Sequence, residues 1–568
     1  MIKLIIFPKS KFRLLLYEPS LYSMFFTMYT LLWTVVSLVF IIIPLLTVYK
    51  GVGRKPPNFP PGPPTLPLIG NLHQIPATRP HIQFQKWAQE YGPVYSLILG
   101  TQVLIVLSTD QAVKDLLDKR SAIYSSRPPS YIAQDVLSGG LRVLLLEYGD
   151  IWKEIRKIAH QIMNVKVSST YVPYQDLESV AMLMGFLNDP AEFTQHIRRY
   201  TSSIFTQMTY GFRINSVNDE YFKTAMSIFN ETSNVIRSAT AALLDAFPLL
   251  RSLPDVFLPT VKYAKQIHKR EFNLFTGQYL HTREKLRAGL AKPCFCSDLV
   301  RMQDTEGYSD RFAAYLAGSL LQAGSETTSA ILVGFIQAMV IFPDAMEAAQ
   351  KEIDKVCGGR MPDLNDFPQL PFVRGCVKEC LRWMPTTLLG VPHAVIRDDE
   401  YMGYRIPKGA TVMYNVWTLH NDPTRYPNPR LYDPGRWVHD STNSAESATL
   451  ADVTQRDHFV FGAGRRLCQG MHIADRTLFL AISRLLWGFN IRRAVDSKTG
   501  VEILPDMHDL EDGLFTQPRP FPAAITPRME RTERIREEWA KMQDLLDKDM
   551  QWKEVPEGLI WKDYEMTE

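Results

Sequence analysis

Residues 459–470 read FVFGAGRRLCQG and contain one cysteine, Cys468, among three glycines and after two consecutive arginines. A cysteine thiolate binds metal ions strongly, but in apolar surroundings the thiol stays protonated unless its negative charge is stabilised. Glycines let backbone N–H groups approach the sulfur closely, and a helix that begins just after the cysteine adds the positive end of its dipole. Residues 471–489 have helical periodicity. The stretch therefore predicts a stabilised thiolate at the start of a helix.

The two arginines of this stretch, Arg465 and Arg466, suit a large anionic ligand in the same place, such as the carboxylates of a cofactor. A cysteine thiolate on haem iron, with the haem propionates nearby, meets both requirements. The alternative is a buried structural cysteine in a glycine-rich loop. The ligand role is favoured because one ten-residue frame holds Phe461, Gly464, Arg466, Cys468 and Gly470.

Length and composition restrict the class of protein. The chain has 568 residues, 46% of them hydrophobic, which is enough to bury a sizeable core. A net charge of +3 provides no electrostatic surface for nucleic acid, so we expect no nucleic-acid partner. Six cysteines in a chain of this length do not indicate a disulfide framework.

An apolar segment near the N-terminus predicts a membrane anchor. Residues 20–49 run for thirty positions without a charge, after a tail at residues 1–19. About 20 apolar residues span a bilayer, and the apolar region of a cleavable signal peptide is shorter. We therefore expect a retained, single-pass transmembrane helix. Basic residues lie on both sides of it, so the positive-inside rule does not determine its orientation.

The rest of the chain divides into a hinge, one large domain and a tail. Residues 50–74 are proline-rich and predict an extended, semi-rigid hinge. Its second half is expected to pack on the folded body through Leu66, Leu68, Ile69 and Leu72. Residues 75–527 show no repeat and no second linker; helical patterns dominate, and short strands are indicated at 94–108 and 400–417. The expected fold class is mainly α with small β-sheets (α+β).

The charged tail at residues 528–568 predicts a further helix. Four apolar residues fall on one face of that helix: Ile535, Trp539, Met542 and Leu546. Docking on the body or on a partner is one interpretation. A solvated, loosely packed helix is the interpretation that the charge favours.

A second long apolar stretch, residues 312–342, carries a single charge, Glu326. The stretch predicts either a second transmembrane helix or the central helix of a large soluble core, apolar all round because it is buried all round. Glu326 lies at mid-length beside Thr327 and Thr328. Such a group is costly inside a bilayer, whereas in a soluble core it marks a site. The core helix is therefore favoured.

The cysteine stretch resembles the FxxGxRxCxG haem-binding signature of the cytochrome P450 superfamily. Other segments resemble landmarks of that family in the expected order. YGDIWKEIRK (148–157) is similar to its WxxxR helix, AGSETT (323–328) to its [AG]Gx[DE]T[TS] motif and KECLRWMP (378–385) to its ExxR motif, and YDPGRW (432–437) lies at the position of its PERF motif. The apolar anchor and PPGPPTLPLIGN resemble the membrane-bound members. The resemblance spans about residues 20–527.

The resemblance implies a cytochrome P450 fold, a haem b cofactor and a set of site residues. Cys468 would be the axial ligand of the haem iron. Residues expected to contact the haem or its propionates are Arg466, Trp152, Arg156, His393, Phe461, Gly464 and Gly470. Thr327 would hold oxygen or water on the central helix, and Glu326 would relay protons. The substrate walls would include residues 128–147, Ala323, residues 386–391 and the turn at 513–515.

The ExxR motif implies a structural network of Glu379, Arg382 and Arg436. Desolvating such charges is expensive, so its expected role is to hold the cysteine loop in register rather than to add stability. Gly435 stands where the family usually has glutamate, which puts the local rigidity in doubt but not the network.

The resemblance also implies the reaction. It is that of a monooxygenase that uses O2 and electrons from NADPH, delivered by a separate flavin-containing reductase, with cytochrome b5 as an additional donor. The expected substrate is a lipophilic molecule that is hydroxylated or epoxidised. Residues 391–437 are similar to fungal enzymes of secondary metabolism, including relatives of O-methylsterigmatocystin oxidoreductase. The expected location is the endoplasmic reticulum membrane, with the catalytic domain facing the cytosol.

The sequence leaves open two alternative functions and the role of one basic surface. The same haem site could serve a desaturase or an oxidative-coupling enzyme. A non-catalytic haem-binding or steroid-binding membrane protein is disfavoured because it gives Glu326 and Thr327 no role. Lys153, Lys157 and Arg465 are expected on the cysteine side, either to dock an acidic electron donor or as ordinary solvated surface.

Overall fold

The computed structural model describes residues 29–30, 33–34, 36–37, 51–511 and 515–559. The predicted tail at 1–19 and most of the predicted anchor at 20–49 lie outside the described residues, so the anchor stays a prediction. One described helix, at residues 310–341, is long and apolar enough to cross a membrane, and 83% of its most apolar window is buried inside the protein. This agrees with the prediction of a core helix.

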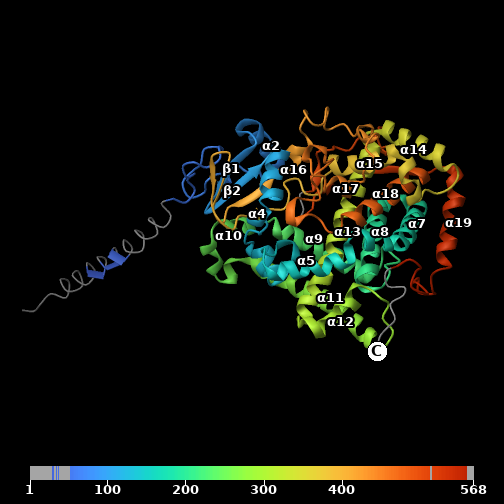
Figure 1. Ribbon diagram of the computed structural model, residues 1–568, viewed down its shortest axis with the longest axis horizontal. Helices are drawn as coiled ribbons and strands as arrows, with labels where there is room; N and C mark the ends of the chain where they lie inside the picture. Colours follow the sequence, from blue (N-terminus) through green and yellow to red (C-terminus); the bar gives the residue numbers. More distant parts are fainter. Residues whose placement is uncertain (1–28, 31–32, 35, 38–50, 512–514, 560–568) are drawn as a thin grey trace, which may run out of the picture.

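Helices dominate the structure and surround this central helix (Figure 1). The described α-helices are α2 (Pro80–Tyr91), α3 (Asp110–Val113), α4 (Ser121–Tyr124), α5 (Asp150–Met163), α6 (Val165–Ser168), α7 (Val172–Asn188), α8 (Phe193–Tyr210), α9 (Glu220–Ile236), α10 (Ala239–Ala246), α11 (Pro259–Arg287), α12 (Phe295–Glu306), α13 (Asp310–Ile341), α14 (Pro343–Cys357), α15 (Pro371–Trp383), α16 (Val416–His420), α17 (Ser444–Ser447), α18 (Met471–Gly488) and α19 (Thr532–Gln543).

The strands form small sheets at the edge of the helical body. They are β1 (Val94–Leu99), β2 (Gln102–Leu107), β3 (His393–Ala394), β4 (Asp399–Tyr401), β5 (Tyr404–Ile406), β6 (Thr411–Tyr414), β7 (Phe489–Arg493), β8 (Leu510–Glu511), β9 (Gln517–Pro518) and β10 (Ala523–Pro527). The largest sheet has the order β1-β2-β6-β3, with β2 parallel to β6 in the register Leu104↔Thr411. Both stretches that the sequence predicts as strands therefore contain strands, and the mainly α fold class is confirmed.

The central helix α13 owes its position to its composition. Ser309 caps its N-terminus by accepting a hydrogen bond from the backbone N–H of Phe312. Its apolar face is continuous around the helix, so it is buried by α8, α11 and α18, which pack along it. Gly324 lets α8 come close: a Cβ at this position would lie 2.2 Å from the ring of Phe205.

The hinge contacts the body in a different way from the one expected. The side chains of Leu66, Leu68 and Ile69 are exposed, so the prediction that they pack on the body is wrong. The backbone makes the contacts instead: Ser96 N–H in β1 donates to Pro61 O at 2.7 Å, and Gly70 forms a β-bridge with Leu99. The prolines have no N–H and contribute carbonyl oxygens, while other hinge residues donate, as Asn71 N–H does to Ile98 O at 2.6 Å.

The tail is integral to the fold, which corrects the expectation of a solvated helix. Helix α19 packs against α7 (Figure 1, far right). Ile535, Leu546 and Trp552 are buried and belong to the main hydrophobic core, and Trp539 and Met542 lie partly buried against it. The apolar face of the predicted helix was therefore a better guide to its environment than its charged residues.

Candidate functional site

The cysteine loop is held by backbone hydrogen bonds. Cys468 N–H donates to Phe461 O at 2.8 Å, and Gly470 is the residue before helix α18, so the helix begins just after the cysteine as predicted. Gly464 has a φ of +61°, and a Cβ there would lie 1.9 Å from Leu117 O. Only glycine allows this close approach. The N–H of Gly464 donates to Asp118 Oδ1 at 2.7 Å, a partner that the sequence did not reveal.

The exposed surface of the Cys468 side chain faces an internal cavity. Burial raises the pKa of the Cys468 thiol, while the backbone N–H of Gly470 and the charge of Arg156 oppose this shift. The cradle alone therefore leaves a protonated thiol, and a metal ion is what would turn it into a thiolate. No group of three or more His, Cys, Asp or Glu side chains among the described residues could hold a bare metal ion.

A cavity of about 330 Å³ lies between Cys468 and the central helix. It collects most of the residues that the sequence predicts for the site. Those lining it are Cys468, Arg466, Trp152, Arg156, His393, Phe461, Gly470 and Thr327. Gly464 and Glu326 do not line it. Residues of the predicted substrate walls also line the cavity: Arg142, Val143, Leu144, Ala323, Thr386, Thr387, Val391 and Phe515. Residues 512–514 lie outside the described residues.

Arg466 and Arg156 are held by hydrogen bonds to main-chain carbonyl groups and by the ring of Trp152. Arg466 donates from Nε to Ser125 O at 2.8 Å and from Nη2 to Leu146 O at 2.6 Å. Arg156, on α5, donates to Leu467 O. The guanidinium of Arg466 lies 4.3 Å from the ring centre of Trp152, and that of Arg156 lies 5.8 Å from it.

A third arginine, Arg127, lines the same cavity and was missed in the sequence. Its Nε donates to Leu144 O at 3.0 Å, and its Nη1 donates to Val391 O and Pro392 O at 2.8 and 2.6 Å. It therefore joins the segments on both sides of the cavity. It lies in YSSRPPS (124–130), where nothing distinguishes it from a surface arginine.

These three arginines form a cluster of positive charge that lacks a counter-ion. Among the described residues no carboxylate pairs with any of them. Burial lowers the pKa of Arg127 to about 10 and that of Arg466 to about 9, and for Arg466 the charges of Arg127 and Arg156 add to the shift. Buried charges that repel one another are costly. A dianionic ligand in the cavity relieves this cost, so the cluster fits the two propionates of a haem.

His393 contributes in its neutral form. Its Nδ1 lies 2.7 Å from Tyr124 O, and because a carbonyl oxygen only accepts, this nitrogen carries the proton. Burial and the positive charges of Arg127 and Arg466 hold the pKa of His393 well below its usual range. The other ring nitrogen is then an acceptor at neutral pH. The imidazole becomes a donor to a carboxylate only when bound anions offset the two arginines.

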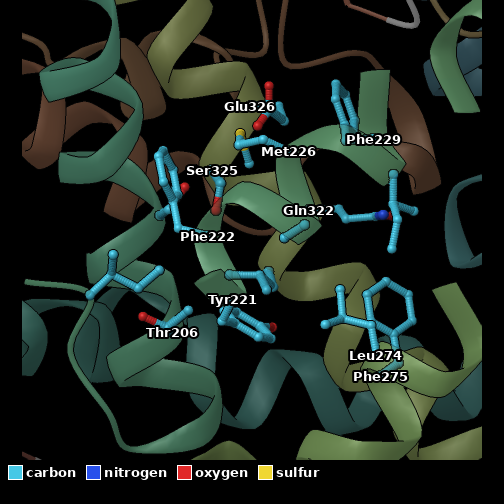
Figure 2. A pocket seen from close by; sticks show the side chains of 15 residues that line it. Thr206, Tyr221, Phe222, Met226, Phe229, Leu274, Phe275, Gln322, Ser325 and Glu326 are labelled. Carbon is cyan, nitrogen blue, oxygen red and sulfur yellow. The ribbon is translucent and has the colours of Figure 1, made fainter. Parts of the chain in front are cut away.

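The structure separates the two predicted catalytic residues. Thr327 lines the main cavity, and its hydroxyl donates to Ala323 O one turn earlier at 2.6 Å. Glu326 lines a neighbouring pocket of about 20 Å³ between α8, α9, α11 and α13, shown in Figure 2. Burial raises the pKa of Glu326 to about 7, and the charge of Arg198 opposes this shift. Gln322 and Phe229 border both spaces.

The predicted charge network is assembled behind the cysteine loop. Arg382 donates to both oxygens of Glu379, at 2.8 and 2.6 Å, and the side chains of both residues are fully buried. Arg436 Nε lies 3.4 Å from Glu379 Oε1, and Trp437 Nε1 donates to Glu379 Oε2 at 3.0 Å. The glycine at 435 does not disturb the network, because its N–H is held by Asp433 Oδ1 at 3.0 Å.

One histidine connects this network to the loop, and no sequence motif identifies it. His420 Nδ1 lies 2.9 Å from Arg382 O, and His420 Nε2 accepts from the N–H of Phe459 at 2.8 Å. Phe459 is the first residue of the cysteine stretch. The network therefore reaches the loop through hydrogen bonds to its backbone.

The wall opposite the cysteine is made of apolar side chains that the sequence did not assign to the site. They come from α8 (Phe205, Met208) and α9 (Phe229), while α5, which packs beside the cysteine loop, adds Ile155, Ala159, Ile162 and Met163 to the cavity lining. Phe229 stacks on Phe515, with ring centres 6.2 Å apart and planes within 9°. Such residues look like ordinary core positions in a sequence, so no local signal identifies them.

Known proteins resemble the whole chain. The family model for cytochrome P450 matches residues 60–520. Cytochrome P450 monooxygenase fogE of Aspergillus ruber is 58% identical over 90% of this chain and 95% of its own length. Cytochrome P450 monooxygenase virE of Hypocrea virens is 57% identical over 94% and 97%, and fsoB of Humicola fuscoatra is 49% identical over 91% and 96%.

Among solved structures, a zebrafish cytochrome P450 determined with progesterone superposes with a TM-score of 0.63 over 79% of this chain and 99% of that one, at 23% identity. This likeness shows the fold. The chain belongs to the cytochrome P450 family and is a cytochrome P450 monooxygenase. The predicted resemblance to fungal members of the secondary-metabolism type is confirmed, and membership implies a haem-thiolate cofactor.

Proposed function

We propose that this protein is a membrane-anchored monooxygenase of fungal secondary metabolism that hydroxylates or epoxidises a lipophilic substrate. It would use O2 and electrons from NADPH, passed on by a flavin-containing reductase. One observation carries the proposal: Cys468, Thr327 and three arginines without a carboxylate partner among the described residues line a single cavity. That arrangement suits an anionic, thiolate-bound cofactor with a hydroxyl on the opposite side.

The chain's own side chains would hold the haem through its propionates and through its iron. Arg127, Arg156 and Arg466 would donate to the propionates. The ring of Trp152 packs against the guanidinium groups of Arg156 and Arg466 and would help to position them. Cys468 would bind the iron. When bound, the haem supplies the iron at which O2 is activated, and thiolate ligation favours cleavage of the O–O bond.

Thr327 and Glu326 would deliver protons to the cavity. The Thr327 hydroxyl donates to Ala323 O, so its lone pairs remain free to accept from a water molecule. Glu326 can give and take a proton near neutral pH because its pKa is about 7. Its pocket has room for about one water, and the hydroxyls of Ser202 and Ser325, which line it, have no partner among the described residues. A water there would connect Glu326 to its surroundings.

The substrate would be lipophilic and uncharged. The wall opposite the cysteine is mostly apolar, and its one ion pair is internally satisfied: Arg142 Nη2 donates to both oxygens of Glu271, at 3.1 and 2.9 Å. Gln322 accepts from Arg142 and donates to Glu271. This wall therefore offers apolar surface and no free charge to a ligand.

Membrane attachment is supported by a group of exposed apolar side chains. Leu66 and Leu68 of the hinge, and Leu249, Val256 and Phe257 after α10, are exposed. The two groups belong to one end of the molecule, since Gly70 pairs with Leu99 and Thr101 N–H donates to Ala246 O. The described body also begins at this end, because Gly53 N–H donates to Gly100 O. Vesicles should retain protein lacking residues 1–49, and replacing Val256 and Phe257 with serine should release it.

The cysteine side would receive the electron donor. Lys153, Lys157 and Arg465 are exposed there; Lys153 pairs with Asp150, and Arg465 donates to the hydroxyl of Tyr148. An acidic flavin-containing reductase would be attracted to this face, and cytochrome b5 could use the same charges. The location that follows is the endoplasmic reticulum membrane, with this face in the cytosol.

Desaturation and oxidative coupling are the alternatives, because both use the same cofactor and cavity. Comparing metabolites of a gene-deletion strain with those of its parent by accurate mass separates them. We expect a compound to accumulate that lacks one oxygen relative to the lost product. A difference of two hydrogens, or the loss of a dimer, would show that the monooxygenation assigned here is the wrong reaction.

A spectroscopic test addresses the site directly. The purified full chain should bind haem, and its reduced form should give the carbon monoxide difference band of a thiolate-ligated haem. Cys468→Ala should abolish that band, while Cys357→Ala, a cysteine on α14 far from the cavity lining, should keep it. A parent protein that binds haem without the band would contradict thiolate ligation and leave only non-catalytic haem binding.

A further inference from the structure

The last 48 residues of the chain, 521–568, extend past the cytochrome P450 family model, which ends at residue 520. Residues 532–559, called here the C-terminal segment, nevertheless bury side chains in the main core of the domain. The segment runs along α19, turns at Asp547, and returns to pair Leu546 with Trp552 in a β-bridge. Its contacts concentrate on α7 and on the last turn of α8.

Gln551 is paired with the main chain just after α8. The N–H of Arg213 donates to Gln551 Oε1 at 2.7 Å, and Gln551 Nε2 donates back to Arg213 O at 3.0 Å. Arg213 also donates from Nη1 to Met550 O at 3.1 Å, and its guanidinium lies 5.7 Å from the ring centre of Trp539. This reciprocal pairing fixes the end of α8 against the C-terminal segment.

Trp552 reaches the helix itself. Its Nε1 donates to Gln207 Oε1 at 2.5 Å, and its ring packs against Tyr174 of α7 with centres 5.9 Å apart. Lys292 donates to the backbone oxygen of Trp552. Both Trp552 and Gln207 are buried. A hydrogen bond between two buried side chains is costly to break, because each partner is left unsatisfied.

Gln207 leads to a buried charge cluster. Its Nε2 donates to Glu178 Oε1 at 3.0 Å. Glu178 is fully buried and pairs at 2.5 Å with both Arg199 and Arg213. The C-terminal segment thus supplies contacts to Gln207 and Arg213, two of the groups that satisfy this carboxylate. The position of the end of α8 depends on both sets of contacts.

The opposite face of the same helix turn is a cavity wall. Met208 and Thr209 line the main cavity, and Phe205 meets α13 at Gly324. We propose that the C-terminal segment is a positioning element for the substrate cavity, acting through Trp552 and Gln207 to set where the last turn of α8 lies. The inference rests on the proposed function in one respect: it takes this cavity as the substrate site.

The test uses the haem-loaded full chain and two azoles of different size. Imidazole reaches the iron without filling the cavity, whereas the bulky aryl azole clotrimazole also contacts the walls. Spectral titration measures the dissociation constant of each. Trp552→Phe keeps an aromatic ring against Tyr174 but loses the indole N–H donor and part of the ring volume. We expect it to weaken clotrimazole binding roughly threefold to tenfold and to leave imidazole binding unchanged.

Further variants complete the design. Trp552→Ala should have a larger effect of the same kind, and Lys541→Ala, at an exposed position on α19, should change neither constant. If Trp552 acts through Gln207, then Trp552→Phe should add little to Gln207→Met in a double-mutant cycle, although Gln207→Met also removes the donor to Glu178. Additive effects would overturn the proposed route through Gln207.

Two results would overturn the positioning role itself. Trp552→Phe could lower the thermal unfolding temperature while both dissociation constants stay unchanged, which would make the segment a stabilising element only. The two azoles could instead weaken equally, which would place the effect at the iron. Failure of the proposed function is a separate observation, because the parent protein would then lack the carbon monoxide band.

Discussion

The cavity has two walls that are built in different ways. On the cysteine side, arginines donate to main-chain oxygens, and a glycine with positive φ lies against Leu117 O. On the distal side, the wall consists of apolar side chains such as Phe205, Met208 and Phe229, from separate helices. Backbone contacts accept few residue types, whereas apolar packing accepts many of similar volume. The first wall therefore carries a motif, whereas in the second wall the motif is confined to the central helix and the apolar side chains of α8 and α9 carry none.

The largest expected effect lies in the scaffold behind the cysteine wall. Glu379→Gln should lower the free energy of unfolding by about 3–5 kcal/mol, because Arg382 would keep a buried charge without its partner. Chemical unfolding monitored by the haem and by circular dichroism measures it. Glu352→Gln on the neighbouring α14 is the matched control. Within the described part of the chain, its half-buried carboxylate accepts from the N–H groups of Phe372 and Val373 and pairs with no cation, so about 1 kcal/mol is expected.

Glu326 tests whether the distal side contains a carboxyl group whose ionised form is destabilised by burial. Its pKa rises from 4.5 in the unfolded chain to about 7 in the native state. Between these values the unfolded chain has released the proton and the native protein keeps it, so the free energy of unfolding falls as pH rises and levels off above about pH 7. The contribution is about 3 kcal/mol in total.

Glu326→Gln should remove this part of the pH dependence and leave the variant more stable than the parent at about pH 8. Unfolding at about pH 5 and about pH 8 gives the difference. Glu347→Gln, at an exposed position on α14, serves as the control. Equal slopes in parent and Glu326→Gln would show that the Glu326 carboxyl is hydrated rather than desolvated.

Arg127 tests how much one arginine on the cysteine side contributes to haem retention. Arg127→Ala removes donors to Leu144 O, Val391 O and Pro392 O together with one charge of the cluster. Haem should dissociate roughly 30-fold faster, corresponding to about 2 kcal/mol. Transfer of haem to apomyoglobin measures the rate. Arg127→Lys keeps the charge and should be intermediate; a rate like that of the parent in Arg127→Ala would remove Arg127 from the site.

The smallest effect is expected in the distal wall. Phe515→Ala removes one ring of the pair with Phe229 and should weaken clotrimazole binding by about 1 kcal/mol, close to fivefold. The carbon monoxide band and the rate of haem loss should stay those of the parent. A change in haem retention as large as that of Arg127→Ala would mean that the two walls are not independent.

The cysteine loop, the helix after it and the central helix were predictable from short stretches of sequence. A thiol, two glycines that allow close backbone approach and a following helix act over a few residues, so their meaning is local. The ExxR network was predictable through the family resemblance, which joins Glu379 and Arg382, one turn apart on α15, to Arg436. His420 and Asp118, which hold the same loop, were not, because their contacts form only when distant segments meet.

For the tail, the sequence predicted the helix but not the residues that it contacts. Its apolar positions predicted a helix with one buried face, yet nothing in residues 528–568 says that Trp552 meets Gln207, 345 positions earlier. Charged residues on the exposed face suggested solvent, and the core contacts of Ile535 decided otherwise.

The sequence by itself determined the family, through motifs that lie in the expected order, together with the cysteine predicted as ligand and the main helices, which follow from periodicity and from residues that the backbone admits at close range. Only the tertiary structure decided that Arg127 completes an unpaired cluster of positive charge, that Glu326 and Thr327 face different spaces, and that the C-terminal segment supports α8. The physical reason is that burial and charge pairing are properties of neighbours in space, and long-range contacts leave no periodic trace in the chain.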